Sequence, residues 1–383
     1  RPVLADVPAG TPFVESKTLP VRVYYSGGAP QAQADSLLAE IEKAWPVQVV
    51  ELGFATPLRL VDGAITPGFH IHITQTGPTV GYTFEVLGDH QATPAADCAI
   101  LGVVNKDYLK SQIYYQDAAW HVLNHAALHA VDCLERSVPT NDIFSIGLQH
   151  LRSEIPPGYF KLETEAFQGF PEYPLDALGS AKEDLYYPFG AALFAVFLDQ
   201  RFGVGDGRLL AEIWRHTAQP GHITEVDTRN TELVTADVPN DPTWLDAVDQ
   251  ALAGKGSSLA AAYREFAIWR LLVGKYADGK HYRDAARYPV PAISRTHVAG
   301  DLPVANAHPA KKVGNWGTSY VLLDPSAVPA GQAVLVRFWG YKPFRWAAQV
   351  VCIRDGAEAR VLPLELDASF LGTRLVDPAG CQA

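Results

Sequence analysis

The sequence predicts an α+β protein made of three successive lobes. The N-terminal part combines one amphipathic helix with several short strands, the middle is a series of helix-period segments, and the C-terminal part returns to short strands between Pro and Gly turns. At 383 residues the chain is long enough for more than one domain. We expect an N-terminal α/β lobe at 1–110, a helical lobe at 111–290 and a β-sandwich at 295–383.

Alternating apolar residues predict the strands of the first lobe. Between the first two strands, Leu37, Leu38, Ile41, Ala44 and Trp45 form one apolar stripe, which predicts a helix beginning at Asp35 and ending before Pro46. His70 and His72 alternate on one strand and so share a face, which we expect to be the solvated face of an edge strand. The predicted strands are 21–25, 70–73, 82–86 and 99–104.

The helical lobe and the β-sandwich are predicted from changes in how often apolar residues recur along the sequence. Helical segments are predicted at 113–136, 160–170, 187–202, 207–218, 242–253 and 257–273. The polar stretch 219–242 is predicted to be a surface loop. After Pro289 and Pro291, short strands are expected at 319–323, 333–339 and 346–353.

Composition argues against a nucleic-acid partner and a membrane span, but it does not decide whether the cysteines are paired. Asp and Glu number 42 against 31 Lys and Arg, a net charge of -11, which argues against nucleic acid as a partner. No apolar run approaches the roughly 18–20 residues of a membrane span. The four cysteines are either buried thiols or two bridges, and pairing Cys98 with Cys133 and Cys352 with Cys381 would keep each bridge within one lobe. Two bridges would imply a secreted protein.

The segment 120–132 carries a row of histidines. On a helix, His125 and His129 lie one turn apart on nearly the same face, the spacing at which two imidazoles meet one metal ion. His121 extends the row backward, and Asp132 lies close to the same direction. The alternative is a helix whose three histidines are each hydrogen-bonded or exposed.

A third ligand is expected from a later helix, in the segment 158–169. Glu163 and Glu165 are the candidates, but they point about 200° apart on a helix and cannot both face one site. In the zinc-peptidase motif His-Glu-x-x-His, the two histidines bind zinc and the Glu is the general base. Here the frame runs from His125 to His129, and the Glu position is Ala126.

These residues resemble the secreted bacterial zinc metallopeptidases of the gluzincin type, in which His-Glu-x-x-His is followed by a helix with Glu-x-x-Ala. The further likenesses are loose ones, in the segments Leu198-Asp199-Gln200-Arg201-Phe202-Gly203, Glu265-Phe266-Ala267-Ile268-Trp269 and Gly317-Thr318-Ser319-Tyr320-Val321. The resemblance implies Zn2+ held by His125, His129 and Glu163, because in that group the acid that precedes x-x-Ala is the ligand. It also implies secretion and a protein, glycoprotein or peptide substrate.

The departure from that group is Ala126, where the family has its catalytic Glu. Two explanations are an engineered Glu-to-Ala change and a natural loss of turnover, of which we favour the first. The leading hypothesis is therefore a secreted zinc endopeptidase present as an inactive variant. The alternative is a natural non-catalytic binding protein that recognises a protein or glycan.

Four further residues are candidates for supporting the site. Asp132 and His150 lie close to the metal-binding segments in the sequence, and Tyr186 and Tyr187 precede an apolar helix. A Tyr or His near zinc often stabilises the oxyanion in such sites. Ordinary packing in the core or at a rim is the alternative for each of them.

Overall fold

The structure, a computed structural model, confirms the α+β class. It describes residues 7–76, 81–133, 138–175, 177, 186–218, 220–221, 225–227, 232–234, 243–298, 301–303, 311–342, 344–354 and 356–382. The chain divides into two compact units, the first made of Arg1–Pro156 with Ala192–Leu259 and the second of Pro157–Ala191 with Ala260–Ala383. These units cut across the three predicted lobes, whose boundaries stay a prediction.

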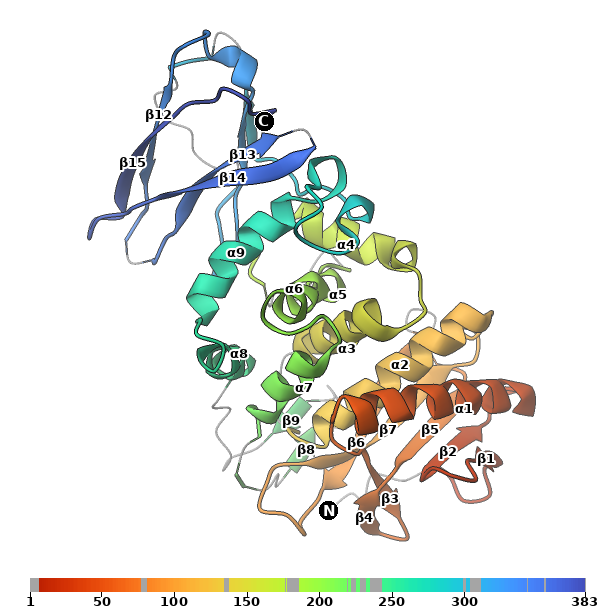
Figure 1. Cartoon of the computed structure of the whole chain (residues 1–383). Coiled ribbons are helices and arrows are strands. Elements are labelled where there is room, and N and C mark those ends of the chain that lie inside the picture. Colours follow the sequence, from red (N-terminus) through yellow and green to blue (C-terminus); the bar gives the residue numbers. More distant parts are fainter. Residues whose placement is uncertain are drawn as a thin grey trace. The chain divides into compact units, whose positions relative to one another are not determined.

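A mixed sheet organises the first unit (Figure 1). Its strand order is β1-β2-β5-β7-β6, with β2, β5 and β7 parallel and with β1 and β6 antiparallel to their neighbours. All four predicted strands of this region are present. The strands of the first unit's N-terminal part are β1 (Phe13–Glu15), β2 (Val21–Tyr25), β3 (Leu58–Val61), β4 (Ala64–Pro67), β5 (Phe69–Thr74), β6 (Tyr82–Asp89) and β7 (Cys98–Asn105).

The strand order corrects the prediction for His70 and His72. Their strand, β5, lies between β2 and β7 in the sheet interior, not at an edge. His70 is 1% exposed, and His72 is half-buried with its Nε2 2.8 Å from the Ser26 Oγ. A solvated histidine face was therefore the wrong expectation, because strand order is not readable from the apolar pattern of a single strand.

Two helices cover one face of this sheet, and others pack beyond them (Figure 1). Helix α1 begins at Gln31, four residues before the expected Asp35, and Pro46 begins a π-helical turn, η1, that continues it. Helix α2 ends at His129, so Asp132 lies past its end and not on its face. The helical elements of this unit are α1 (Gln31–Trp45), η1 (Pro46–Glu51), α2 (Gln112–His129), α3 (Val138–Arg152), α6 (Ala192–Phe202), α7 (Arg208–Arg215) and α8 (Trp244–Ala253).

Helix α3 was missed by the sequence analysis, which assigned no element to its residues. The expected surface loop at 219–242 falls mostly outside the described residues, but it contains the short antiparallel pair β8 (Glu225–Asp227) and β9 (Glu232–Val234).

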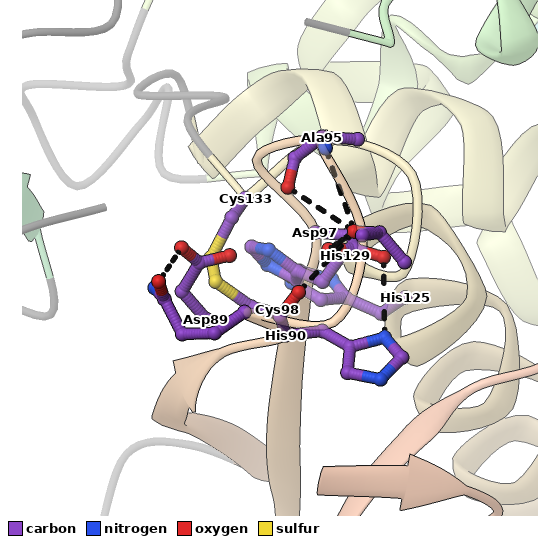
Figure 2. Close-up of a disulfide and its surroundings, with 10 residues drawn as sticks. Asp89, His90, Ala95, Asp97, Cys98, His125, His129 and Cys133 are labelled. Atoms are coloured by element: carbon purple, nitrogen blue, oxygen red, sulfur yellow. Dashed lines mark hydrogen bonds and ion pairs between the residues drawn. A yellow bond between two sulfur atoms is a disulfide. The ribbon is translucent and has the colours of Figure 1, made fainter. Parts of the chain in front are cut away.

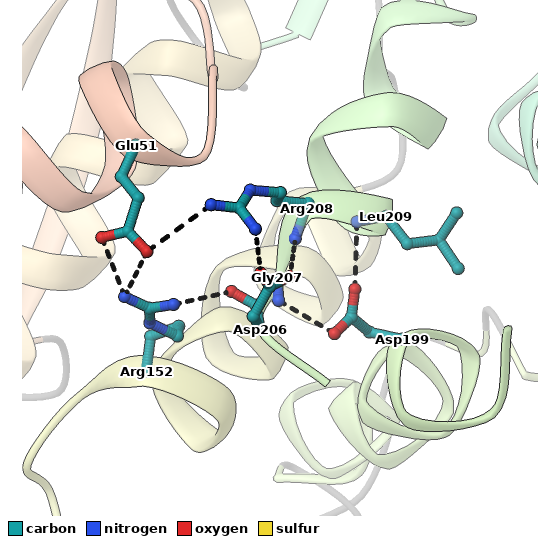
Figure 3. Close-up of polar contacts among 7 residues, drawn as sticks. All are labelled: Glu51, Arg152, Asp199, Asp206, Gly207, Arg208 and Leu209. Carbon is teal, nitrogen blue, oxygen red and sulfur yellow. Dashed lines mark hydrogen bonds and ion pairs between the residues drawn. The ribbon is translucent and has the colours of Figure 1, made fainter. Parts of the chain in front are cut away.

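The segment at the end of α6 that resembles the peptidase family has a structural role. The carboxylate of Asp199 accepts hydrogen bonds from the Gly207 N–H at 2.9 Å and the Leu209 N–H at 3.0 Å, and so caps the start of α7 (Figure 3). Beside it, Arg152 of α3 donates to both carboxylate oxygens of Glu51 at 2.9 and 3.0 Å. The Arg152 contact fixes α3 against η1, and the Asp199 contacts fix α6 against α7. Helix α3 supplies a residue of the site described below.

The second unit joins helices to the C-terminal strands. Buried Arg270 of α9 donates to the Gln168 Oε1 at 2.9 Å and lies over the Phe167 ring, which fixes α4 against α9. Its elements are η2 (Pro157–Phe160), α4 (Lys161–Gly169), α5 (Tyr187–Gly190), α9 (Leu259–Leu271), η3 (Gly274–Tyr276), η4 (Ala285–Arg287), β10 (Arg295–His297), β11 (Val321–Leu323), η5 (Pro325–Ala327), β12 (Val334–Trp339), β13 (Ala348–Arg354), β14 (Ala357–Leu364) and β15 (Leu371–Val376).

The C-terminal strands form two antiparallel pairs, β12 with β15 and β13 with β14. The three strands expected there are present, whereas β10, β14 and β15 were missed. Ile353 of β13 packs against Ile268, Leu272 and Tyr276, so the strand region shares a core with α9 and the turn after it. None of the helices within the described ranges has the length and apolar character needed to cross a bilayer.

Candidate metal centre

Helix α2 is buried all round in its second half. From Asp117 to His129 every residue is buried, including Trp120, Val122 and Leu123 on different faces. A helix that is apolar on all sides belongs to a protein interior. The histidines of α2 are therefore core residues, and a solvent-exposed row is excluded for them.

The structure brings two of these histidines to an aspartate. The Nε2 of His121 lies 3.0 Å from the Oδ1 of Asp142, which comes from α3. His121, His125 and Asp142 each offer one ligand atom, and these atoms all lie within 4.8 Å of one another. All three side chains are buried, so this cluster is a candidate site for a metal ion.

The pair predicted from the spacing is also close. The Nε2 atoms of His125 and His129 lie 3.1 Å apart. Two ligand nitrogens on one tetrahedral zinc are about 3.3 Å apart for Zn–N bonds of about 2.0–2.1 Å. The same distance suits a hydrogen bond between two neutral imidazoles. The geometry of the pair is therefore compatible with a zinc-bound state and with a metal-free, hydrogen-bonded state.

The imidazoles are held in the form that binds metals. Burial, followed by the neighbouring His129 and His121, lowers the pKa of His125 well below its ordinary value. Burial also lowers the pKa of His129 to about 4. Both rings are therefore neutral near pH 7, and a neutral imidazole has a nitrogen lone pair available for a metal.

Two aromatic side chains of the edge strand β6 orient the histidine rings. Phe84 stacks on His125 with ring centroids 3.7 Å apart and planes within 7°. Tyr82 lies 4.4 Å from the His121 ring. These contacts limit ring rotation and so restrict where the ligand nitrogens point.

A disulfide closes the end of α2 onto the sheet. Cys98, at the start of β7, is bonded to Cys133, and the Cys133 N–H also donates to the Ala96 carbonyl at 2.8 Å. Figure 2 shows His125 and His129 in the surroundings of this bridge. The second bridge joins Cys352 and Cys381. Both expected pairings are confirmed, and the buried-thiol alternative is wrong.

The remaining predicted residues are distributed over both units. Ala126 is fully buried within α2, and Asp132 is buried just beyond its end. His150 lies in the last turn of α3, where burial lowers its pKa to about 4. Their proposed roles in catalysis stay predictions.

Glu163, Tyr186 and Tyr187 belong to the second unit, so their part in a shared site also stays a prediction. Glu163 is half-buried in the first turn of α4, whereas Glu165 is exposed and its Oε1 lies 3.6 Å from the Lys161 Nζ. Tyr186 is 40% exposed. The buried Tyr187 hydroxyl donates to the carbonyls of Tyr173 and Pro174 at 3.2 and 3.0 Å.

Sequence reasoning missed Asp142. The available signal was an acid on a segment with the apolar residues Ile143, Phe144 and Ile146, all of which are buried in the structure. Since no helix was predicted there, the acid was not considered as a ligand.

Comparison of the chain with protein-family models and with curated protein sequences finds no match.

Proposed function

We propose that this chain is a metal-binding protein of the zinc-peptidase type whose general-base position is Ala126. The observation that carries the proposal is the buried group of His121, His125 and Asp142, with ligand atoms within 4.8 Å of one another. Buried polar groups are costly unless they are paired or bind an ion. His121 and Asp142 are already paired at 3.0 Å, and a shared metal ion would bind both of them together with His125.

Zinc is the metal that suits these donors best. Two imidazoles and one carboxylate with a fourth position open is a ligand set typical of catalytic zinc. Calcium and magnesium prefer sets made of oxygen atoms only. In the alternative arrangement that the family resemblance implies, His125 is shared, and His129 and Glu163 replace His121 and Asp142.

The proposed activity depends on a zinc site that is present and a general base that is missing. Bound zinc lowers the pKa of its water and polarises a peptide carbonyl. A Glu at position 126 would accept the water's proton and pass it to the leaving amine, but the methyl group of Ala126 cannot. We therefore propose that the chain binds metal and a peptide or protein and hydrolyses peptides very slowly or not at all.

A second candidate function is that of a natural binding protein that recognises a protein or glycan. Ala126 favours it, because a chain that had lost its general base would keep a metal only as a structural or binding element. The Glu variant described below separates the two. Secretion is part of both proposals, since two disulfides are compatible with an extracellular protein.

Metal titration of the purified chain tests the ligand set. After removal of metal with a chelator, we expect one zinc per chain by calorimetry and elemental analysis. Asp142→Asn keeps the side chain's shape, and we expect it to weaken zinc binding at least tenfold. Glu163→Gln is the matched test of the alternative ligand set, and the exposed Glu165→Gln is the control.

The outcomes are distinguishable. A loss with Asp142→Asn alone supports the cluster in the first unit, and a loss with Glu163→Gln alone supports the ligand set of the peptidase family. No zinc binding by the parent chain at micromolar concentration would overturn the metal proposal altogether.

Ala126→Glu tests the peptidase half of the proposal. We expect zinc affinity close to that of the parent, because the residue is not a ligand, together with peptide hydrolysis above the parent's level. General-base catalysis typically contributes 10²–10⁴-fold. A zinc-loaded, folded Glu variant that cleaves nothing in a broad peptide library would favour the binding protein.

A further inference from the structure

The turn after β12 exposes a dense set of large aromatic side chains. Trp339 is 78% exposed, Tyr341 74% and Phe344 51%. Solvent exposure of three large aromatics within six residues is unusual, since such residues carry most of the apolar surface that folding normally buries. We call Trp339, Tyr341 and Phe344 the aromatic tip.

The aromatic tip continues onto an apolar face of the β12–β15 pair. In the register of this pair Trp339 lies opposite Leu371, and Leu335 lies opposite Leu375. Leu335 is 59% exposed and Leu375 67%. On the same face, between the two leucine positions and Trp339, lies the pair Arg337 and Thr373, so the exposed face carries apolar side chains on both sides of a basic one. Exposed apolar groups of this kind mark interaction sites.

The turn is built to hold this conformation. The Trp346 indole N–H donates to the Tyr341 carbonyl at 2.8 Å, and the Gly340 N–H donates to the Phe370 carbonyl at 2.9 Å. A Cβ on Gly340 would clash with the Trp346 ring, so glycine allows this close packing. These contacts hold the backbone at Gly340 and Tyr341, so little backbone conformational entropy would be lost there on binding.

The charge around the aromatic tip indicates what it binds. Between 325 and 354 the sequence contains no Asp or Glu, whereas Arg337, Lys342, Arg345 and Arg354 are all basic. Arg337, Lys342 and Arg345 are exposed beside the aromatic tip. The acid Asp367 lies at the same end of the strand pair, where its Oδ1 accepts a hydrogen bond from the Leu371 N–H at 3.1 Å, so the basic groups outnumber it. The whole chain has a net charge of -11, so this basic segment departs from the chain's composition.

We propose that the aromatic tip is a peripheral membrane-binding surface for anionic lipid. Trp, Tyr and Phe partition into the interface between headgroups and acyl chains, and flanking Lys and Arg attract anionic headgroups. An acidic protein would need this local basic segment to approach such a surface. The proposal is independent of the metal centre, which lies in the other unit.

Vesicle flotation with the full chain tests this proposal. We expect the chain to float with vesicles of phosphatidylcholine that contain phosphatidylglycerol, to bind vesicles of phosphatidylcholine alone much more weakly, and to be released by salt. Changing Trp339 and Tyr341 together to Ala should weaken binding at least about tenfold. Each of Arg337→Gln, Lys342→Gln and Arg345→Gln should weaken it roughly fivefold.

The control is Val50→Ala, which removes an apolar side chain that is 74% exposed in the first unit. It should leave vesicle binding unchanged, and circular dichroism of all variants should match the parent. Quenching of tryptophan fluorescence by brominated lipid should also fall in Trp339→Phe. Equal binding of parent and tip variants, no preference for anionic vesicles, or binding to a soluble polyanionic glycan in place of vesicles would each overturn the proposal.

Discussion

Among the residues that the structure describes, α2 and β5 both carry buried or half-buried histidines with a spacing that suits metal binding, and the surroundings of the two groups differ. On α2, His121 and His125 lie beside the carboxylate of Asp142. On β5, the pKa of His70 is lowered to about 4, chiefly by burial, and the guanidinium groups of Arg59 and Arg22 act in the same direction. A carboxylate neutralises part of a cation's charge, whereas two guanidinium groups repel it. The charge of the neighbours, rather than the spacing, therefore separates the candidate metal site from an ordinary core histidine.

The largest effect that tests this comparison is loss of the metal. His125→Ala should abolish zinc binding at micromolar concentration, because His125 belongs to both possible ligand sets. His72→Ala, which also removes an imidazole from a short His-x-His spacing, should keep the parent's stoichiometry of bound zinc. Calorimetric titration of the two variants side by side measures the difference. Equal loss in both would show that the α2 cluster has no special role.

The two disulfides offer a second comparison, between the units. Cys98 and Cys133 are 35 residues apart, and a chain-entropy calculation for a loop of that length gives about 4 kcal/mol of stabilisation. Changing both to Ser should lower the free energy of unfolding by roughly that amount and also weaken zinc binding, because the bridge ties the end of α2 to β7.

Removing the Cys352–Cys381 bridge is the matched control. Its cysteines are 29 residues apart, so the expected destabilisation is similar, about 3–4 kcal/mol. Zinc affinity should nevertheless stay at the parent's value, because this bridge lies in the other unit. Chemical denaturation gives the two stabilities, and titration gives the two affinities. A loss of zinc affinity in the control would show that destabilisation alone is enough to disturb the site.

The sequence correctly predicted the helices and strands whose apolar pattern is set by their own residues rather than by their neighbours in the fold. The strands at 21–25 and 99–104 were correct because their β-branched and apolar runs are strong local signals. The position of α1 was right but its beginning was four residues out, since Asp35 is a plausible cap while the structure uses Pro30 there without a side-chain hydrogen bond. Element ends depend on such local competition more than element centres do.

The parts of the site that were missed depend on which elements become neighbours. The spacing of His125 and His129 identified the helix of the candidate metal site, because both residues lie on one helix. Asp142 comes from a second helix packed against it, and the position of β5 in the sheet depends on pairing with β2 and β7. Neither relation leaves a periodic pattern in the sequence, so the acid was overlooked and His70 was wrongly placed at an edge.

The smallest expected effect is the loss of stability at acid pH that is caused by His70. Its pKa is lowered from an ordinary 6.5 to about 4 in the folded chain, so between these values the unfolded chain binds more protons. Stability is then lost as the pH falls from about 6.5 toward 4. For His70 alone, lowering the pH from about 7.5 to about 5.5 should reduce the free energy of unfolding by about 1–2 kcal/mol.

His70→Gln tests this contribution through the change in the free energy of unfolding between two pH values, rather than through its value at one pH. The variant is expected to be less stable than the parent at neutral pH, because the residue is buried, but its stability should fall less between the two pH values by about 1–2 kcal/mol. Urea denaturation at both pH values measures the change, and NMR titration of the His70 ring in the parent gives its pKa directly. An ordinary pKa for His70, or a parallel pH dependence in the variant, would show that burial and the two arginine neighbours do not keep it neutral. The contrast between His70 and His121, which lies beside the Asp142 carboxylate, would then lose its physical basis.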